Sequence, residues 1–162
     1  MAFSFIMLGI LIVWVILFLA ETVAFIPKMI VKTAPKDIQE KVLARPDAPK
    51  WKTVTGLILA VLLLLCIAGV LVWAGVDALQ KDMGFGEIWL RYLILLEGYK
   101  LFDIVFFDWI LLTKLHIFQH FFPETVGCKG YNSFGFNGKS QIAKMILFAV
   151  ISAAVAGVLC LL

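Results

Sequence analysis

Apolar residues along this chain gather into four long stretches that polar segments separate. A transmembrane α-helix needs about 20 predominantly apolar residues, at roughly 1.5 Å of rise per residue, to cross the hydrocarbon core of a bilayer. The four stretches meet that length and cover residues of about 3–26, 54–76, 88–112 and 142–162. We therefore expect an all-α membrane protein, a four-helix bundle that forms one transmembrane domain over residues 1–162.

Lysine and arginine residues predict how the four helices are oriented. The connecting segment of about 27–53 carries seven of them, and the segment of about 113–141 with the start of the last helix carries four more. The connection between the second and third helices carries only Lys81. Because positively charged loops stay on the cytoplasmic side, the two basic segments are expected to be cytoplasmic loops and both termini to be outside. This topology suits a multi-pass protein of the cell membrane, such as a bacterial inner membrane.

Composition agrees with a membrane location and excludes one class of partner. Hydrophobic residues make up 63% of the chain and the mean hydropathy is +1.03, whereas soluble domains contain about 45–50% apolar residues. The formal net charge of +3 is too small to indicate nucleic-acid binding. The sequence lacks the short motifs of serine hydrolases, zinc proteases, P-loop enzymes and dinucleotide-binding enzymes. It therefore favours a function other than catalysis and predicts no cofactor.

Four ionisable side chains interrupt the third helix in the stretch "EGYKLFDIVFFD": Glu97, Lys100, Asp103 and Asp108. A charge at the bilayer centre costs at least about 2.5–3.5 kcal/mol, so these groups should face protein or water. At about 100° per residue of an α-helix, all four fall on one arc of less than half the circumference. Lys100 can neutralise one carboxylate, which leaves two negative charges. A proton, a small cation or a basic residue of a partner helix must balance them.

The first cytoplasmic segment contains a second candidate surface. Pro35 and Pro46 bracket a short amphipathic helix that we expect to lie on the inner membrane surface. Basic residues near anionic lipids contribute about 1 kcal/mol of attraction each, although the same charges also serve simply to fix topology. The membrane-surface basic patch consists of Lys28, Lys32, Lys36, Lys41, Arg45, Lys50 and Lys52.

The second cytoplasmic segment carries a candidate metal site. His116 and His120 are four residues apart, a spacing at which two imidazoles on one helix can hold one metal ion. The alternative is that both are interfacial histidines beside aromatic residues. Pro123 should end the helix before Glu124 and so remove a third ligand. The aromatic, glycine-rich remainder of the segment fits either a re-entrant segment or a surface loop.

One part of the chain, roughly 101–144, resembles a known group of proteins. An Asp-x4-Asp-Trp pattern at Asp103, Asp108 and Trp109 is followed by a Pro-x-Thr-x-Gly turn at Pro123, Thr125 and Gly127, and then by Tyr131. This pattern is similar to that of a family of small, uncharacterised bacterial multipass membrane proteins. The family tends to have an acidic residue after the threonine and a histidine after a downstream phenylalanine, whereas this chain has Val126, Gly135 and Asn137. The resemblance implies membrane location and weakens a catalytic or metal function built on that histidine.

Two classes of function remain open. In the first, the chain handles a proton or small cation through the charged arc of the third helix. In the second, it is an accessory or scaffold subunit whose arc pairs with a membrane partner subunit. A membrane enzyme is a third, less favoured class. Small residues recur every fourth position at Ala149, Ala153 and Gly157, a spacing that permits close helix contact within the chain or in a homo-oligomer.

Overall fold

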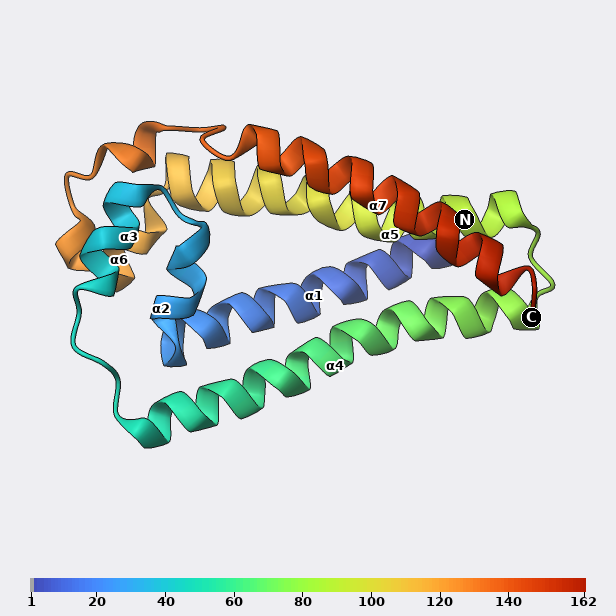
Figure 1. The fold of residues 1–162 in the computed structure, drawn as a ribbon, viewed down its shortest axis with the longest axis horizontal. Helices are drawn as coiled ribbons and strands as arrows, with labels where there is room; N and C mark the ends of the chain where they lie inside the picture. The colour runs from blue at the N-terminus through green and yellow to red at the C-terminus, as the bar shows by residue number, and fades with distance from the viewer. Residues whose placement is uncertain (1) are drawn as a thin grey trace. The chain divides into compact units, whose positions relative to one another are not determined.

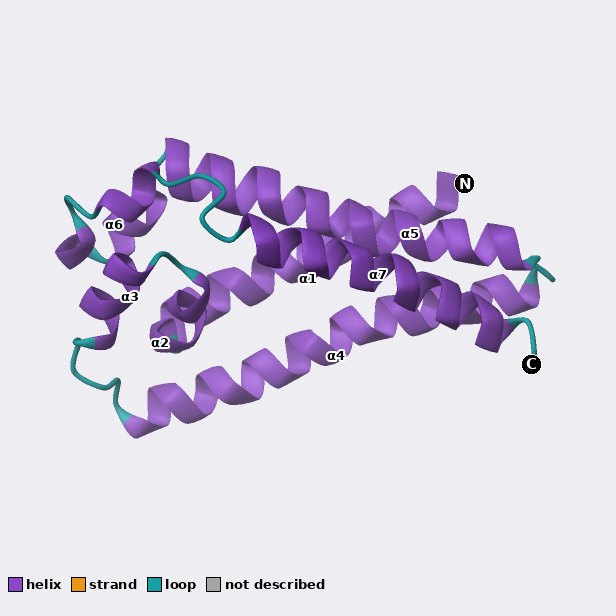
Figure 2. Cartoon of the chain, turned by 45° about the horizontal axis from the view of Figure 1, so that its top comes forward, coloured by secondary structure: helices purple, strands orange, loops and turns teal. Residues whose placement is uncertain are grey.

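The computed structural model describes residues 2–162, and all regular structure in this range is helical (Figures 1 and 2). The long α-helices are α1 (Ala2–Phe25), α4 (Lys50–Gln80), α5 (Phe85–Phe102) and α7 (Gly138–Leu159). A π-helix, η2 (Asp103–Lys114), continues directly from α5. The short elements are α2 (Pro27–Ile30), η1 (Val31–Thr33), α3 (Lys36–Leu43), α6 (Ile117–Phe121), η3 (Pro123–Thr125) and η4 (Lys129–Asn132).

Three of these helices, α1, α4 and α7, are long and apolar enough to cross a membrane. Many of their large apolar side chains are exposed. On α7, for example, Ile146 is 63% exposed and Val150 is 61% exposed. Such surfaces suit lipid contact, because hydrocarbon tails are as apolar as these side chains. The predicted third span differs from the other three, since α5 contains Glu87, Arg91 and further charged residues and then gives way to the π-helix. Length and composition therefore identify three candidate spans.

The chain forms two compact units, each described by itself. Unit 1 comprises residues 2–15, 65–103 and 137–162, with parts of α1 and α4, all of α5, and α7. Its core residues are Met7, Leu11, Val70, Ala74, Ala78, Ile88, Tyr92, Leu95 and Ala156. Gly98 allows α5 to approach α1, because a Cβ atom there would lie 2.7 Å from Cδ2 of Leu8. Unit 1 is therefore held by close helix packing.

A buried arginine joins α4 to α5 within unit 1. Arg91 donates hydrogen bonds through one terminal nitrogen to the carbonyl oxygen of Ala74 (3.0 Å) and to Asp77 Oδ2 (2.8 Å). Lys81 forms a second ion pair with Asp77 at 2.8 Å. A buried guanidinium is tolerated only when it is paired and hydrogen-bonded. Asp77 thus contacts both basic residues of this hairpin, and the three groups together keep one formal positive charge.

Unit 2 comprises residues 16–64 and 104–136. Two segments predicted to be separate cytoplasmic loops share one hydrophobic core here, made by Val31, Ile38, Val42, Leu112, Phe122, Cys128 and Tyr131. We call residues 31–43 and 122–133 the cap. The helix predicted between Pro35 and Pro46 is present as α3, and its apolar Ile38 and Val42 are buried in the cap core. These two side chains therefore pack against protein, whereas Leu43 is 42% exposed, and the position of α3 on the inner membrane surface stays a prediction.

Candidate functional site

The charged stretch of the third predicted helix begins in unit 1, on the last two turns of α5. Lys100 is buried, and its ammonium group forms an ion pair with the carboxylate of Asp103, the residue that follows α5. The two residues are three apart, a spacing at which side chains meet on a helix. Lys100 and Asp103 therefore neutralise each other.

Glu97 is the neighbouring carboxylate that the ion pair of Lys100 with Asp103 leaves without a counter-charge. Its Oε2 atom is buried and has no hydrogen-bond partner among residues 2–162. Lys100 is also three residues from Glu97, but it is engaged by Asp103. Glu97 as a whole is partly exposed, but an enclosed carboxylate oxygen without a partner is unfavourable, so a bound proton, a cation or a partner group would stabilise it. Glu97 is therefore the candidate in unit 1 for one of the two excess negative charges expected from the sequence, and that assignment stays a prediction.

The structure changes the expected position of Asp108, which lies in unit 2. The common arc was derived for an α-helix, whereas the backbone from Asp103 onward follows a π-helix, as the bond from Leu115 N to Ile110 O (2.9 Å) shows. Hydrogen bonds in a π-helix run to the fifth preceding residue, so an angle of about 100° per residue no longer applies. The arc derived from the sequence is therefore supported only as far as Asp103. That Asp108 lies on the same arc as Glu97, Lys100 and Asp103 remains a prediction.

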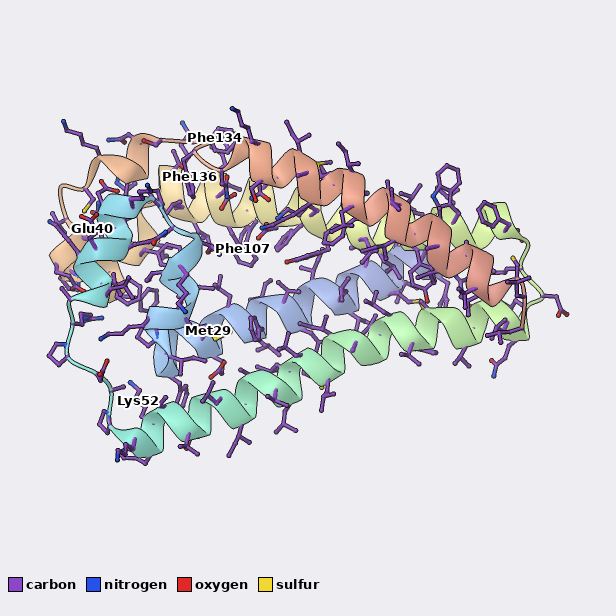
Figure 3. All side chains as sticks on the ribbon, in the orientation of Figure 1. Met29, Glu40, Lys52, Phe107, Phe134 and Phe136 are labelled. Carbon is purple, nitrogen blue, oxygen red and sulfur yellow. The ribbon has the colours of Figure 1, made fainter. Side chains whose placement is uncertain are left out.

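All seven residues of the basic patch lie in unit 2, and three of them contact other side chains. Lys28 pairs with the exposed Asp47 at 2.6 Å, and this hydrogen bond holds the pKa of the Asp47 carboxyl below its ordinary value. Arg45 lies 3.0 Å from Glu124 and above the ring of Phe122. Lys52, labelled in Figure 3, lies 5.9 Å from the ring centroid of Phe25. The four that remain exposed are Lys32, Lys36, Lys41 and Lys50.

The two histidines of the predicted metal site do not share a continuous helix. His116 adopts a left-handed conformation (φ 47°) immediately before α6, whereas His120 lies within α6. The His116 ring packs on Tyr131 at 5.3 Å, and the His120 ring packs on Phe121 at 5.6 Å. Over the described range 2–162, no group of three His, Cys, Asp or Glu residues is arranged to hold a metal ion. The metal site therefore gains no support from the structure.

Two of the motif residues that carried the family resemblance, Thr125 and Tyr131, lie inside the cap. The hydroxyl of Thr125 donates to the carbonyl oxygen of Phe122 (2.6 Å), so the phenol of Tyr131 donates to Thr125 Oγ1 (2.6 Å). Gly127 has a φ of 83°, which glycine adopts at little cost. Both polar side chains are fully buried. These residues therefore have a structural explanation, which is to hold the cap together.

Sequence reasoning gave too little weight to Glu21 on α1. Glu21 is 9% exposed, and its Oε1 atom is buried with no hydrogen-bond partner among the residues described. The available signal was a carboxylate beside Thr22 in a 24-residue helix that is otherwise apolar. Glu21 was not singled out from the sequence, and the structure shows a carboxyl group whose Oε1 atom lacks a partner among the described residues.

The fold thus defines a helical protein with three helices able to cross a membrane and a folded cap made from two connecting segments. Comparisons with protein-family models, with curated proteins and with solved structures found no match to this chain. Function is therefore argued from the site alone.

Proposed function

We propose that this chain is a multipass protein of the cell membrane that moves or senses a proton or small cation through Glu97. The observation that carries the proposal is the buried Oε2 atom of Glu97, which has no hydrogen-bond partner among residues 2–162. The neighbouring ion pair of Lys100 and Asp103 supports it, because the pair removes the one basic group within reach on the same helix. Ionisable groups within membrane segments are costly and usually mark ion or proton pathways.

The proposal includes a fourth crossing made by α5 and η2, with both termini outside and two cytoplasmic loops. The 18 residues of α5 and the 12 residues of η2 are consecutive and mostly apolar. The exposed Trp89 toward one end and the exposed Trp109 toward the other suit the two membrane interfaces, where aromatic side chains concentrate. Pairing of Lys100 with Asp103 lowers the cost of placing their charges within the bilayer.

Flux through reconstituted vesicles tests the proposal. Purified protein in liposomes should pass protons or monovalent cations down an imposed gradient, and Glu97→Gln should reduce that flux by about tenfold or more, as expected when one ionisable group is removed from a proton or ion pathway. Glu87→Gln is the matched control. Glu87 is exposed and accepts a hydrogen bond from the Gly84 amide (3.1 Å), which glutamine can also do. Equal flux in wild type and Glu97→Gln would contradict the proposal.

The same unpartnered oxygen supports an alternative function as an accessory subunit. A basic residue of a membrane partner, or of a second copy of the chain, would then supply the positive charge beside Glu97. This alternative predicts a stoichiometric complex that Glu97→Gln dissociates and Glu87→Gln leaves intact. Gentle detergent extraction followed by mass measurement of the complex distinguishes ion handling from the accessory-subunit function. Ion handling by the chain alone requires no partner.

Anionic lipids are a further proposed partner of the cytoplasmic side. The exposed Lys32, Lys36, Lys41 and Lys50 of unit 2 would each add about 1 kcal/mol of attraction to anionic headgroups. This attraction does not require the amphipathic helix to lie on lipid. It acts through charge and would weaken as salt is added.

A further inference from the structure

Glu21 lies where α1 packs against α4 in unit 2. A Cβ atom built on Gly56 of α4 would be 2.7 Å from Cβ of Phe25 and 3.2 Å from Oε1 of Glu21. Glycine at position 56 therefore lets the two helices approach closely, and the carboxyl group of Glu21 is enclosed by that contact. Only 9% of Glu21 is exposed.

No basic group neutralises Glu21 within the described part of the chain. On the α1–α2 side, Lys28 is paired with Asp47 (2.6 Å). On α4, Lys52 lies one turn from Gly56, over the ring of Phe25. The charged residues of η2 in this unit are Asp108 and Lys114, and no ion pair joins either of them, or either lysine above, to Glu21.

Thr22 does not supply the partner that Glu21 lacks. Its hydroxyl donates to the carbonyl oxygen of Phe18 at 2.6 Å and lies 3.4 Å from Glu21 Oε2. A hydroxyl has only one hydrogen to donate, and the bond to Phe18 is the shorter of the two. Glu21 Oε2 therefore receives at most a long hydrogen bond, and the buried Oε1 atom receives none from the described residues. An enclosed carboxyl group with so few donors around it is unfavourable in its ionised form.

A metal cation fits this site less well than a proton. Hard cations require about six or more oxygen ligands, whereas the polar side chains at this contact are Glu21 and Thr22, and Thr22 already contacts Phe18. Within residues 2–162 no further acidic residue, histidine or cysteine joins them in a metal-binding group.

We infer that Glu21 is a second acid site, which binds a proton in the folded protein at neutral pH and forms the α1–α4 contact in its neutral form. Loss of that proton leaves a charge enclosed beside Gly56, and the contact then loosens. The inference goes beyond the proposed function and stands on the surroundings of Glu21 alone, whatever the outcome of the flux measurement on Glu97.

Infrared spectroscopy of the reconstituted full-length protein tests this inference. At neutral pH, the difference spectrum of wild type minus Glu21→Gln should contain the C=O stretch of one protonated carboxylic acid. Glu40, labelled in Figure 3, is exposed on α3, and wild type minus Glu40→Gln should instead contain carboxylate bands. Carboxylate bands in the Glu21 difference spectrum would overturn the inference.

Two variants give further tests of the protonated state of Glu21. Glutamine resembles neutral glutamic acid in size and charge, so Glu21→Gln should fold as well as wild type, and a variant that fails to fold contradicts the inference. Lys52→Gln should leave the Glu21 band unchanged. A band that appears only in Lys52→Gln would show that Glu21 is ionised and paired with Lys52 in the wild type.

Discussion

Lys100 has two carboxylates within reach on its own helix and binds only one of them. Glu97 and Asp103 are each three residues away, and the ion pair forms with Asp103. Sharing the ammonium group would leave both carboxylates partly neutralised, whereas full pairing with Asp103 leaves Glu97 with a buried Oε2 atom and no counter-charge. At the scale of single residues, the pairing of Lys100 with Asp103 therefore distinguishes Glu97, the functional candidate, from these two neighbours.

A second residue-scale contact, between Tyr131 and Thr125, is predicted to stabilise the cap. Tyr131→Phe removes the hydrogen bond of 2.6 Å and should cost about 1 kcal/mol, which is about a fivefold increase in the population of the opened cap. Cys128 is buried in the same core, so the rate at which its thiol is modified reports opening of the cap. The rate is measured in a chain whose Cys66 and Cys160 are replaced by alanine. Tyr99→Phe in unit 1 should leave that rate unchanged, and an unchanged rate in Tyr131→Phe would contradict the assigned role.

Alkaline pH should weaken the cap through the same phenol. Burial raises the pKa of Tyr131 above its ordinary value of 10.0, so the folded cap holds the phenol proton more tightly than the unfolded chain. Its contribution to stability is complete below about pH 10 and is lost as the pH rises through the pKa of the folded state. Tyrosinate absorbance, as wild type minus Tyr131→Phe, should appear at higher pH than that of a free tyrosine. Titration at the ordinary value would show that Tyr131 is not buried.

At the scale of elements, the cap depends on how η4 docks on α3. The amide of Gly130 donates to Asp37 Oδ2 at 2.9 Å. A Cβ atom at position 130 would lie 2.5 Å from Cβ of Pro35 and also too close to Asp37 Oδ1. Gly130→Ala should therefore force the two segments apart and cost about 1–3 kcal/mol.

The Cys128 modification rate checks this prediction, and it should rise about fivefold or more in Gly130→Ala, given that about 1.4 kcal/mol corresponds to a factor of ten. Gly138→Ala is the matched control, because nothing lies within 4 Å of a Cβ atom there and alanine is the better helix former. Similar rates in the two variants would show that η4 does not need to dock on α3.

The same elements show which features could be predicted from the sequence. Pro35, Ile38 and Val42 were sufficient to predict α3, because proline and apolar spacing act locally. They did not reveal what α3 packs against, since an apolar face suits lipid and protein equally. The π-helix from Asp103 was also not predicted. Its hydrogen-bond register is not encoded in a residue pattern, so the angle to Asp108 that was derived for an α-helix does not apply, and the place of Asp108 on the arc stays a prediction.

At the scale of the whole molecule, apolar length and composition were enough to predict α1, α4 and α7 as candidate spans. The fourth crossing, predicted at residues 88–112, stays a prediction, because α5 contains charged residues whose cost depends on their partners, as with Lys100 and Asp103. The burial of Glu21 was likewise not predictable from the sequence. Its burial depends on Gly56, a residue that only the tertiary structure brings beside it.

The proposed orientation of the whole chain is testable by labelling. An impermeant thiol reagent should reach Cys160, which is exposed, from the outside of intact cells. A cysteine introduced by Glu40→Cys, in a chain whose native cysteines are replaced by alanine, should react only after the inner side is opened. The reverse pattern would contradict the positive-inside assignment.

The most direct test of the central claim, that pairing of Lys100 with Asp103 leaves Glu97 available to a proton or cation, is vesicle flux in two linked variants. Asp103→Asn should release Lys100 to pair with Glu97 and lower the flux by about tenfold or more, because a paired ammonium group favours the ionised carboxylate and competes with the proton or cation. The double variant Lys100→Met with Asp103→Asn removes both charges, leaves Glu97 unpaired again, and should restore flux toward wild type. Unchanged flux in Asp103→Asn, or a double variant as slow as Asp103→Asn, would contradict the account.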